Sequence, residues 1–247
     1  MKLSVVIAIL DSHQVVKRQI RHFRAMNLSD DVEFIFVDDG SNPPLDYTHM
    51  MKNLTFYYTN DKRPWTQGLA RNLGASKAKG EYLLFTDIDH IITREAIDDV
   101  LKFDGDKMVF PRFFGILDRQ GNIISDTKSM LEFGLDPARV KGRRGIMCGG
   151  FHGNTYAIRK TIFDAIGGYD PRYCERMFHM GGRYSSEESK FNHKYSNLGR
   201  KGKVKGEVVG SGIYCYPVSK FRTDKDNNPL GLFHGLSLEQ VKQPMKP

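Results

Sequence analysis

The stretch Gly80-Glu81-Tyr82-Leu83-Leu84-Phe85-Thr86-Asp87-Ile88-Asp89 carries the pattern that decides the fold prediction. Residues 81–86 are mostly apolar or aromatic, which predicts a buried strand that runs directly into two carboxylates. Side chains two residues apart in an extended segment point to the same side, so we expect Asp87 and Asp89 to face one ligand. An Asp pair that only initiates a turn is the structural alternative.

Three earlier segments, 4–10, 32–37 and 54–58, are also short apolar strands by composition. After the first of these segments, apolar residues recur at roughly helical spacing, which predicts a helix capped by Ser12. A second helix is predicted over about 66–79, closed by Gly80. The predicted outward-facing residues of the first helix are Lys17, Arg18, Arg21 and Arg24. Alternation of strands and helices predicts an α/β fold with a mostly parallel central sheet flanked by helices.

Carboxylates gather where the predicted strands end. They are Asp11, Asp38, Asp39, Asp87 and Asp89. In parallel α/β sheets, ligands bind beyond the carboxyl ends of the strands. Neighbouring carboxylates repel each other unless a cation or hydroxyl donors share them, so the pattern predicts a metal or a polyhydroxylated ligand at this edge.

The alternation weakens after residue 105. Segments 108–110 and 121–124 flank a turn at 118–121 and predict a hairpin or small β-extension. A helix is predicted over 155–166, stopped by Gly167-Gly168. The polar and basic segment 183–206 predicts loops around one or two helical turns. No linker is evident, so we expect one catalytic domain over 1–234, with a donor half (1–105), an acceptor half (106–234) and a tail (235–247).

Composition excludes several classes of protein. The 247 residues are 40% hydrophobic and 27% charged, which argues against disorder. Three widely spaced cysteines, Cys148, Cys174 and Cys215, offer neither a disulfide framework nor a CxxC zinc site. No apolar run is long enough to span a bilayer, and no secretion signal is visible, so we expect a cytoplasmic protein, with peripheral membrane association as an option. Glycine-rich dinucleotide and P-loop motifs are absent.

Charge is unevenly distributed along the chain. Lys and Arg outnumber Asp and Glu by 37 to 29, and residues 141–225 alone hold 17 basic and 7 acidic side chains, a net +10. Such an excess suggests an anionic partner. The glycine-spaced basic loop expected over 193–205 could close over a diphosphate or hold an anionic acceptor, or it could be an ordinary solvated charge run.

Three ordered segments carry a family resemblance: Val37-Asp38-Asp39-Gly40-Ser41, Ala70-Arg71-Asn72-Leu73-Gly74, and the stretch 80–89 quoted above. Together they resemble the family 2 glycosyltransferases, which have a GT-A fold. The resemblance continues weakly through 149–151, 156–160 and 166–170, and covers about two thirds of the chain. It implies a single GT-A-type domain that uses a nucleoside diphosphate sugar as donor.

The resemblance also implies roles for individual residues. Asp89 would be the direct metal ligand and Asp87 a ribose or further metal contact, while Asp39 and Asp11 would hold the nucleoside. A third metal ligand would be His234, although a histidine between apolar residues is often structural. The expected cofactor is Mn²⁺ or Mg²⁺, because the leaving diphosphate develops charge that a divalent cation neutralises.

The base is expected in the second half of the chain. Inverting transfer needs one group to take the proton of the acceptor hydroxyl. The family usually supplies this base from a Glu-Asp pair. Here Glu188 stands in the place of the Asp, with Glu187 before it. The structural alternative is that the two acids belong to the first turn of a helix, where they are common. His152 could line the acceptor site. Two roles of Arg71 stay open: a contact with the sugar donor, or a surface ion pair with an acid such as Asp61.

These residues predict a metal-dependent, inverting glycosyltransferase that moves a sugar from a nucleoside diphosphate donor, with UDP favoured over GDP, to a hydroxyl acceptor. The basic surplus adds an anionic acceptor to the expectation: a glycan, a lipid-linked phosphate or DNA. Two alternatives stay open. One is a glycosyltransferase that modifies hydroxylated bases in DNA, and the other is a non-catalytic module of the same fold that binds anions.

Overall fold

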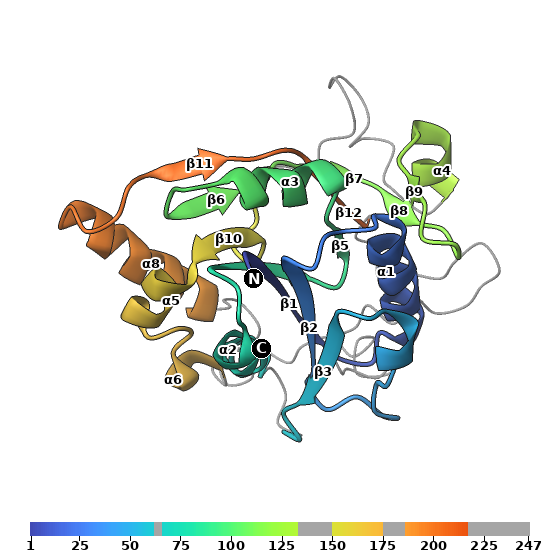
Figure 1. Cartoon of the computed structure of the whole chain (residues 1–247), viewed down its shortest axis with the longest axis horizontal. Helices are drawn as coiled ribbons and strands as arrows, with labels where there is room; N and C mark the ends of the chain where they lie inside the picture. The colour runs from blue at the N-terminus through green and yellow to red at the C-terminus, as the bar shows by residue number, and fades with distance from the viewer. Residues whose placement is uncertain (62–65, 133–149, 175–185, 217–247) are drawn as a thin grey trace, which may run out of the picture.

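A seven-stranded sheet forms the centre of the computed structural model, which describes residues 1–61, 66–132, 150–174 and 186–216. Its strand order is β11-β6-β10-β4-β1-β2-β3 (Figure 1). The strands are β1 (Leu3–Ile9), β2 (Val32–Asp38), β3 (Leu54–Tyr58), β4 (Tyr82–Asp87), β6 (Lys107–Val109), β10 (Tyr156–Arg159) and β11 (Glu207–Val209). All pairs are parallel except the two that β10 makes, which confirms the predicted α/β fold with a mostly parallel sheet.

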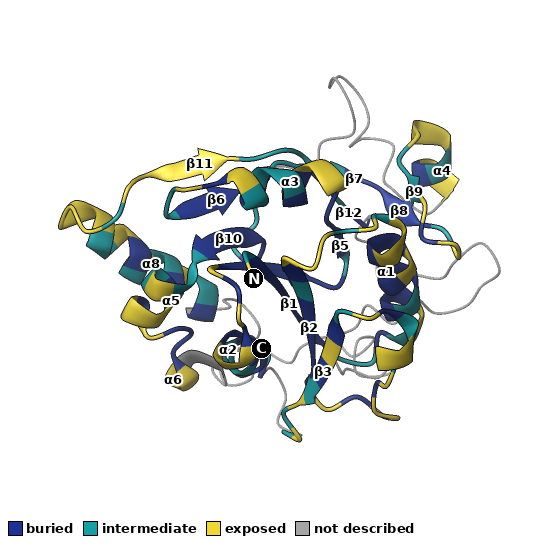
Figure 2. Ribbon diagram, in the orientation of Figure 1, coloured by how far each residue is buried: buried dark blue, intermediate teal, exposed yellow. Residues whose placement is uncertain are grey.

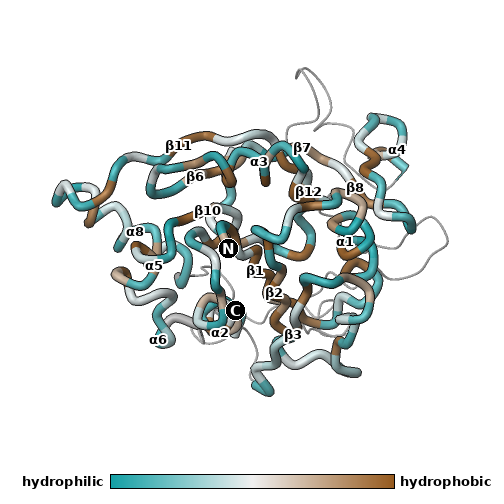
Figure 3. The backbone as a smooth tube through the Cα atoms, viewed as in Figure 1, coloured by the Kyte–Doolittle hydropathy of each residue, from teal (hydrophilic) through white to brown (hydrophobic). Residues whose placement is uncertain are grey.

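The inner strand β1 is buried along its whole length because helices cover both faces of the sheet. Its residues Val5, Ile7 and Ile9 pack into one apolar cluster with α1 (His13–Ala25), whereas Val6 and Ala8 pack into a second cluster with α2 (Gln67–Lys77). Burial on both faces explains the mostly apolar runs of β1 and β2, which are mainly brown in Figure 3 and mainly dark blue in Figure 2.

Register brings the carboxyl ends of three strands together. Ile9 of β1 lies opposite Asp38 of β2, and Ala8 of β1 lies opposite Asp87 of β4. The predicted gathering of acids at one sheet edge is therefore confirmed for Asp38 and Asp87.

Glycines allow α2 and the chain after it to approach β1 closely. A Cβ atom on Gly74 would lie 2.4 Å from Cγ1 of Val6, and one on Gly80 would lie 2.5 Å from the backbone nitrogen of Ser4. The prediction that Gly80 closes the helix is wrong: α2 ends at Lys77, and Ala78 is extended. Gly80 instead lets the chain pass the start of β1, and its N–H donates to Oγ of Ser4.

The predicted helix over 155–166 is only half right. Residues Tyr156–Arg159 form β10, which pairs antiparallel with β4 and β6, and only α5 (Lys160–Ile166) is helical. Tyr156, Ala157 and Ile158 are buried in the middle of the sheet, so tertiary pairing decides this segment. The predicted stop is confirmed, since Gly167 ends α5 in a left-handed conformation with φ of 78°.

A small hairpin forms at the predicted turn, but with a different first strand. β8 (Ile116–Leu117) pairs with β9 (Ile123–Ile124), whereas Met108 and Val109 belong to β6 of the central sheet. The carboxylate of Asp118 holds the turn by accepting hydrogen bonds from the backbone N–H groups of Gln120 and Asn122. A third sheet comprises β5 (His90–Ile91), β12 (Ile213–Cys215) and β7 (Arg112–Phe114).

The prediction of loops over 183–206 is wrong for most of the segment. Ser186–Arg200 forms a helix of 15 residues, α8, which presents Phe191, Tyr195 and Leu198 at helical spacing to the second apolar cluster. The basic loop predicted over 193–205 is thus a helix end followed by a short turn. The other described helices are η1 (Thr48–Met50), α3 (Arg94–Lys102), α4 (Thr127–Glu132) and α6 (Pro171–Cys174).

Two smaller predictions about the first helix need correction. Ser12 occupies the N-cap position of α1 but makes no capping hydrogen bond with its side chain, which donates to the carbonyl of Leu10 instead. Arg18 is not exposed, because its side chain is buried and donates to the carbonyl of Leu117 in the hairpin. Among the described residues, no helix is long and apolar enough to cross a membrane.

Candidate active site

Asp87, the last residue of β4, lies at the centre of the candidate site. It is buried, and it accepts hydrogen bonds from two residues of α2: Gln67 Nε2 at 2.9 Å and Arg71 Nη2 at 2.5 Å, both on its Oδ1. Asn154 Nδ2 lies 3.2 Å from its other oxygen. The strand end and the first turns of α2 therefore fix the orientation of this carboxylate.

Arg71 is a buried cation of the site, and its side chain is 0% exposed. Besides the ion pair with Asp87, its Nη1 donates to Oδ1 of Asn154 at 3.0 Å, and its guanidinium lies 5.5 Å from the ring centroid of Tyr169. The partner of Arg71 is thus Asp87 rather than Asp61. A buried ion pair of this kind is strongly destabilised when one partner is removed, because the other charge is left uncompensated.

Two histidines join Asp87 in a group that could hold a metal ion. One potential ligand atom from each of Asp87, His90 and His152 lies within 4.8 Å of the others, and the two imidazole rings meet edge to face at 5.1 Å. Nδ1 of His90 lies 2.5 Å from Oγ1 of Thr155. Burial lowers the pKa of His152 to about 4, so this imidazole is neutral at pH 7, as a metal ligand must be.

The donor set fits a transition metal better than Mg²⁺. Imidazole ligands suit transition metals and Mg²⁺ prefers oxygen ligands alone, so Mn²⁺ is the more compatible of the two expected ions. Of the predicted ligands, Asp87 belongs to this group, His234 lies outside the described residues, and Asp89 is partly buried in the turn after β4. The negative charge of Asp89 raises the pKa of His152, against the larger effect of burial.

The sequence did not single out His90 as a candidate ligand, and it suggested His152 for the acceptor site, whereas the structure brings both side chains close to Asp87. The available signal was position, since His90 directly follows the Asp87-Ile88-Asp89 motif. His152 is far from this motif in the sequence, and it lies close to the motif because β10, which follows His152, pairs with β4. Only that antiparallel pairing brings the segment before β10 to the end of β4.

Glu187 and Glu188 occupy the first turn of α8 and lie beside the same site. Glu187 is 1% exposed, and Glu188 is partly buried. Burial raises the pKa of Glu188 to about 7; the charges of Asp87 and Glu187 add to this effect, while Arg71 and a hydrogen bond with Asn154 oppose it. A carboxyl group with a pKa near neutrality is well suited to act as a general base.

Asn154 links the two halves of the site. It contacts Arg71 and Asp87 at the sheet edge, and it hydrogen-bonds to Glu188 on α8. The neighbouring Gly153 leaves room for this approach, since a Cβ atom there would lie 3.2 Å from Oε2 of Glu188. Nothing in the local sequence pattern marks Asn154, so its role follows from the tertiary structure alone.

The acids predicted to hold the nucleoside lie at the ends of β1 and β2. Asp39 is 7% exposed and accepts hydrogen bonds from the hydroxyls of Thr59 and Thr66; burial, partly offset by these bonds, raises its pKa to about 6. Asp38 holds the following turn by accepting from the N–H groups of Ser41 and Leu45. Asp11 has a φ of 47°, and its carboxylate accepts from the N–H of Asn42.

Fold and site together define an α/β domain with the architecture of a GT-A fold and a buried Asp87-Arg71 pair at the end of β4. Residues 4–109 match the family model described as "Glycosyltransferase like family 2". The predicted resemblance to the family 2 glycosyltransferases is therefore confirmed for the part of the chain that carries the donor motifs. No curated protein matches the chain.

Solved glycosyltransferases share the fold at low sequence identity. TarS of S. aureus is 16% identical, with a TM-score of 0.55 over 87% of this chain and 37% of the TarS chain. A shorter TarS structure, residues 1–349 in complex with UDP-GlcNAc, is also 16% identical, with a TM-score of 0.51 over 89% of this chain and 59% of the other. Glucosyl-3-phosphoglycerate synthase from Mycobacterium tuberculosis is 15% identical, with a TM-score of 0.50 over 88% of this chain and 73% of the synthase chain. The chain spans less than two thirds of the length of these TarS chains.

Proposed function

We propose that this protein transfers a sugar from a nucleoside diphosphate donor to a hydroxyl acceptor, with inversion at the sugar carbon. The observation that carries the proposal is the convergence of Asp87, Arg71, Asn154 and Glu188, which come from four separate elements, beyond the carboxyl end of β4. Clustered titratable groups with a pKa shifted toward neutrality, as that of Glu188 is, are typical of active sites.

In the proposed reaction, Glu188 takes the proton from the acceptor hydroxyl as the oxygen attacks the anomeric carbon. The bond between that carbon and the diphosphate breaks, and its electron pair leaves with the nucleotide. Asn154 and Arg71 orient Glu188 and Asp87 relative to each other. A divalent ion held by Asp87, His90 and His152, with Asp89 as a further candidate, would neutralise the charge that develops on the diphosphate.

Donor choice is part of the proposal. Asp39 and Asp11 would accept hydrogen bonds from the base or ribose of the nucleotide, as a carboxylate can. A TarS structure of the same fold contains UDP-GlcNAc, which supports a UDP-sugar as the first donor to test. Mn²⁺ is the first metal to test, given the two imidazoles of the site.

Donor hydrolysis tests the proposal without knowledge of the acceptor, because water can replace the hydroxyl. We expect release of UDP from a panel of UDP-sugars in the presence of Mn²⁺. Glu188→Gln should bind the donor with unchanged affinity, measured by titration calorimetry, and should release UDP at least 100-fold more slowly. Glu95→Gln is the matched control, since Glu95 also lies in the first turn of a helix but is exposed.

Two results would contradict the proposal. Donor binding without any turnover in the wild type, across the donor panel and metals, would favour a non-catalytic anion-binding module. Equal turnover by wild type and Glu188→Gln would remove Glu188 from the mechanism, and loss of turnover in Glu187→Gln alone would move the base by one residue.

A further inference from the structure

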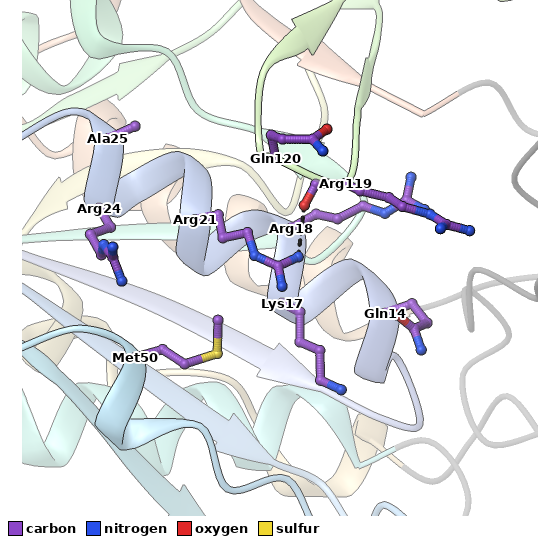
Figure 4. Close-up of a pocket in the computed structure, with 9 residues that line it drawn as sticks. All are labelled: Gln14, Lys17, Arg18, Arg21, Arg24, Ala25, Met50, Arg119 and Gln120. Carbon is purple, nitrogen blue, oxygen red and sulfur yellow. Dashed lines mark hydrogen bonds between the residues drawn. The ribbon is translucent and has the colours of Figure 1, made fainter.

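A basic pocket lies on the outer face of α1, and the proposed function does not use it. Its volume is about 1070 Å³, and it lies between the helix, Met50 and the turn of the β8–β9 hairpin (Figure 4). The lining residues are Gln14, Lys17, Arg18, Arg21, Arg24, Ala25, Met50, Arg119 and Gln120. Five of them are cationic, and none of these described lining residues carries a carboxylate.

The cations form a continuous row along one helix face. Lys17, Arg21 and Arg24 are spaced by four and three residues, which places neighbouring side chains on the same side of the helix. The row from Lys17 to Arg24 is about 10 Å long at 1.5 Å per residue. Like charges at this spacing repel each other, so the bare row is unfavourable and a bound polyanion would stabilise it.

Uncharged groups orient several of these side chains. Arg18 donates from Nη1 to the carbonyl of Leu117 at 2.9 Å, and Arg21 donates from Nη1 to the carbonyl of Arg119 at 2.7 Å, the dashed contact in Figure 4. Nζ of Lys17 lies 5.1 Å from the ring centroid of Tyr47. The contacts of Lys17 and Arg21 are to an aromatic ring and to a carbonyl oxygen, so they do not neutralise the positive charges of these two side chains.

The composition of the pocket selects the kind of anion. Four of the five cations are arginines, whose planar guanidinium groups match phosphoryl oxygens with two parallel hydrogen bonds. None of the described lining residues is aromatic, so they offer no platform on which nucleic acid bases could stack. Among these described residues, only Ala25 and Met50 are apolar, which is little for insertion into a membrane.

The pocket is separated from the candidate active site by α1 itself. On the inner side of this helix, Gln19 Nε2 donates to the carbonyls of Ile88 and His90, within the segment that carries the candidate metal ligands. We propose that the outer pocket of α1 is a second anion site, which binds a ligand carrying two or more phosphoryl groups independently of the sugar donor.

Tripolyphosphate is the probe for this site. Titration calorimetry of the full chain should detect its binding, at least tenfold tighter than that of inorganic phosphate, and binding should weaken as salt rises from 50 to 300 mM. The variant Arg21→Glu/Arg24→Glu should bind tripolyphosphate at least tenfold more weakly. Its matched control is Lys201→Glu/Lys203→Glu, which changes the net charge equally at exposed positions outside the pocket and should bind within twofold of wild type.

Further measurements distinguish binding at this pocket from binding at the donor site and from binding to a membrane surface. Arg21 and Arg24 are exposed, so the pocket variant should keep the circular dichroism spectrum and Tm of wild type. UDP should not displace tripolyphosphate, and the pocket variant should bind a UDP-sugar as wild type does, even if no turnover is ever found. Vesicles containing phosphatidylglycerol show whether the phosphoryl groups come from lipid: binding that tripolyphosphate displaces supports the site with a headgroup as its source.

Three results would overturn the proposal: no detectable tripolyphosphate binding, equal weakening in the pocket and control variants, or displacement by UDP. Vesicle binding that tripolyphosphate does not displace would also overturn it, because the protein would then recognise a charged surface rather than phosphoryl groups in the pocket.

Discussion

The pH dependence of sugar transfer gives the most specific test of the candidate base. The pKa of Glu188 is raised to about 7 from an ordinary value of 4.5, and a base acts only when it is ionised. With a pKa of about 7, roughly 9% of the enzyme carries ionised Glu188 at pH 6 and roughly 91% at pH 8. We therefore expect the turnover rate at saturating donor to rise about tenfold between these two pH values.

An ordinary glutamate would give a different profile, because it would already be almost fully ionised at pH 6. Two variants of neighbouring residues should move the midpoint in opposite directions. Glu187→Gln removes a negative charge that raises the pKa of Glu188, so the midpoint should fall; Asn154→Ala removes a hydrogen bond that lowers this pKa, so the midpoint should rise. Initial rates of UDP release, measured from pH 5 to pH 9 in a constant-ionic-strength buffer, report these shifts.

Donor binding must be measured over the same range, because Asp39 titrates too. Its pKa is raised to about 6, so a donor that needs the Asp39 carboxylate should bind more weakly as the pH falls through 6. Asp39→Asn should remove this lower transition and leave the transition of Glu188 in the turnover rate. A flat wild-type rate between pH 6 and pH 8, or shifts of the same sign in Glu187→Gln and Asn154→Ala, would refute the assignment of the base.

Three further predictions concern stability and metal binding. Arg71→Met should lower the free energy of unfolding by about 3–5 kcal/mol in urea titrations, because it leaves the buried carboxylate of Asp87 without its counter-charge. Adding Asp87→Asn to this variant should recover part of the loss. Additive effects of the two substitutions would contradict the pairing. Gly74→Ala should lower the free energy of unfolding by about 1–3 kcal/mol, because the new Cβ would clash with the side chain of Val6. An unchanged urea midpoint would contradict this close packing. His90→Ala should weaken Mn²⁺ binding at least tenfold by calorimetry, and undiminished affinity would exclude this histidine as a ligand.

Much of the first half of the fold could be predicted from the sequence because its signals are local. The runs that form β1, β2 and β4 are mostly apolar and buried, as expected of strands covered on both faces, and each stops at a turn or a carboxylate. Asp39, Asp87 and Glu188 could be singled out because each belongs to a short motif whose order along the chain resembles that of a known family.

The second half of the fold could not be predicted from the sequence, because its helices and strands depend on contacts with residues that are distant in the sequence. Residues 156–159 fit a helix as well as a strand by local pattern, and pairing with β4 and β6 decides the strand. α8 is polar and basic over most of its surface, and it forms because a narrow row of Phe191, Tyr195 and Leu198 packs against the second apolar cluster.

The sequence by itself determined the α/β class, the strand-end acids and the identity of the acidic pair at 187–188. Only the tertiary structure decided that Arg71 neutralises Asp87, that His90 and His152 meet there, and that Asn154 bridges to Glu188. The reason is physical: hydrophobic periodicity is written along the chain, whereas the pKa of a carboxyl and the partners of a buried charge depend on groups that only folding brings within a few ångströms.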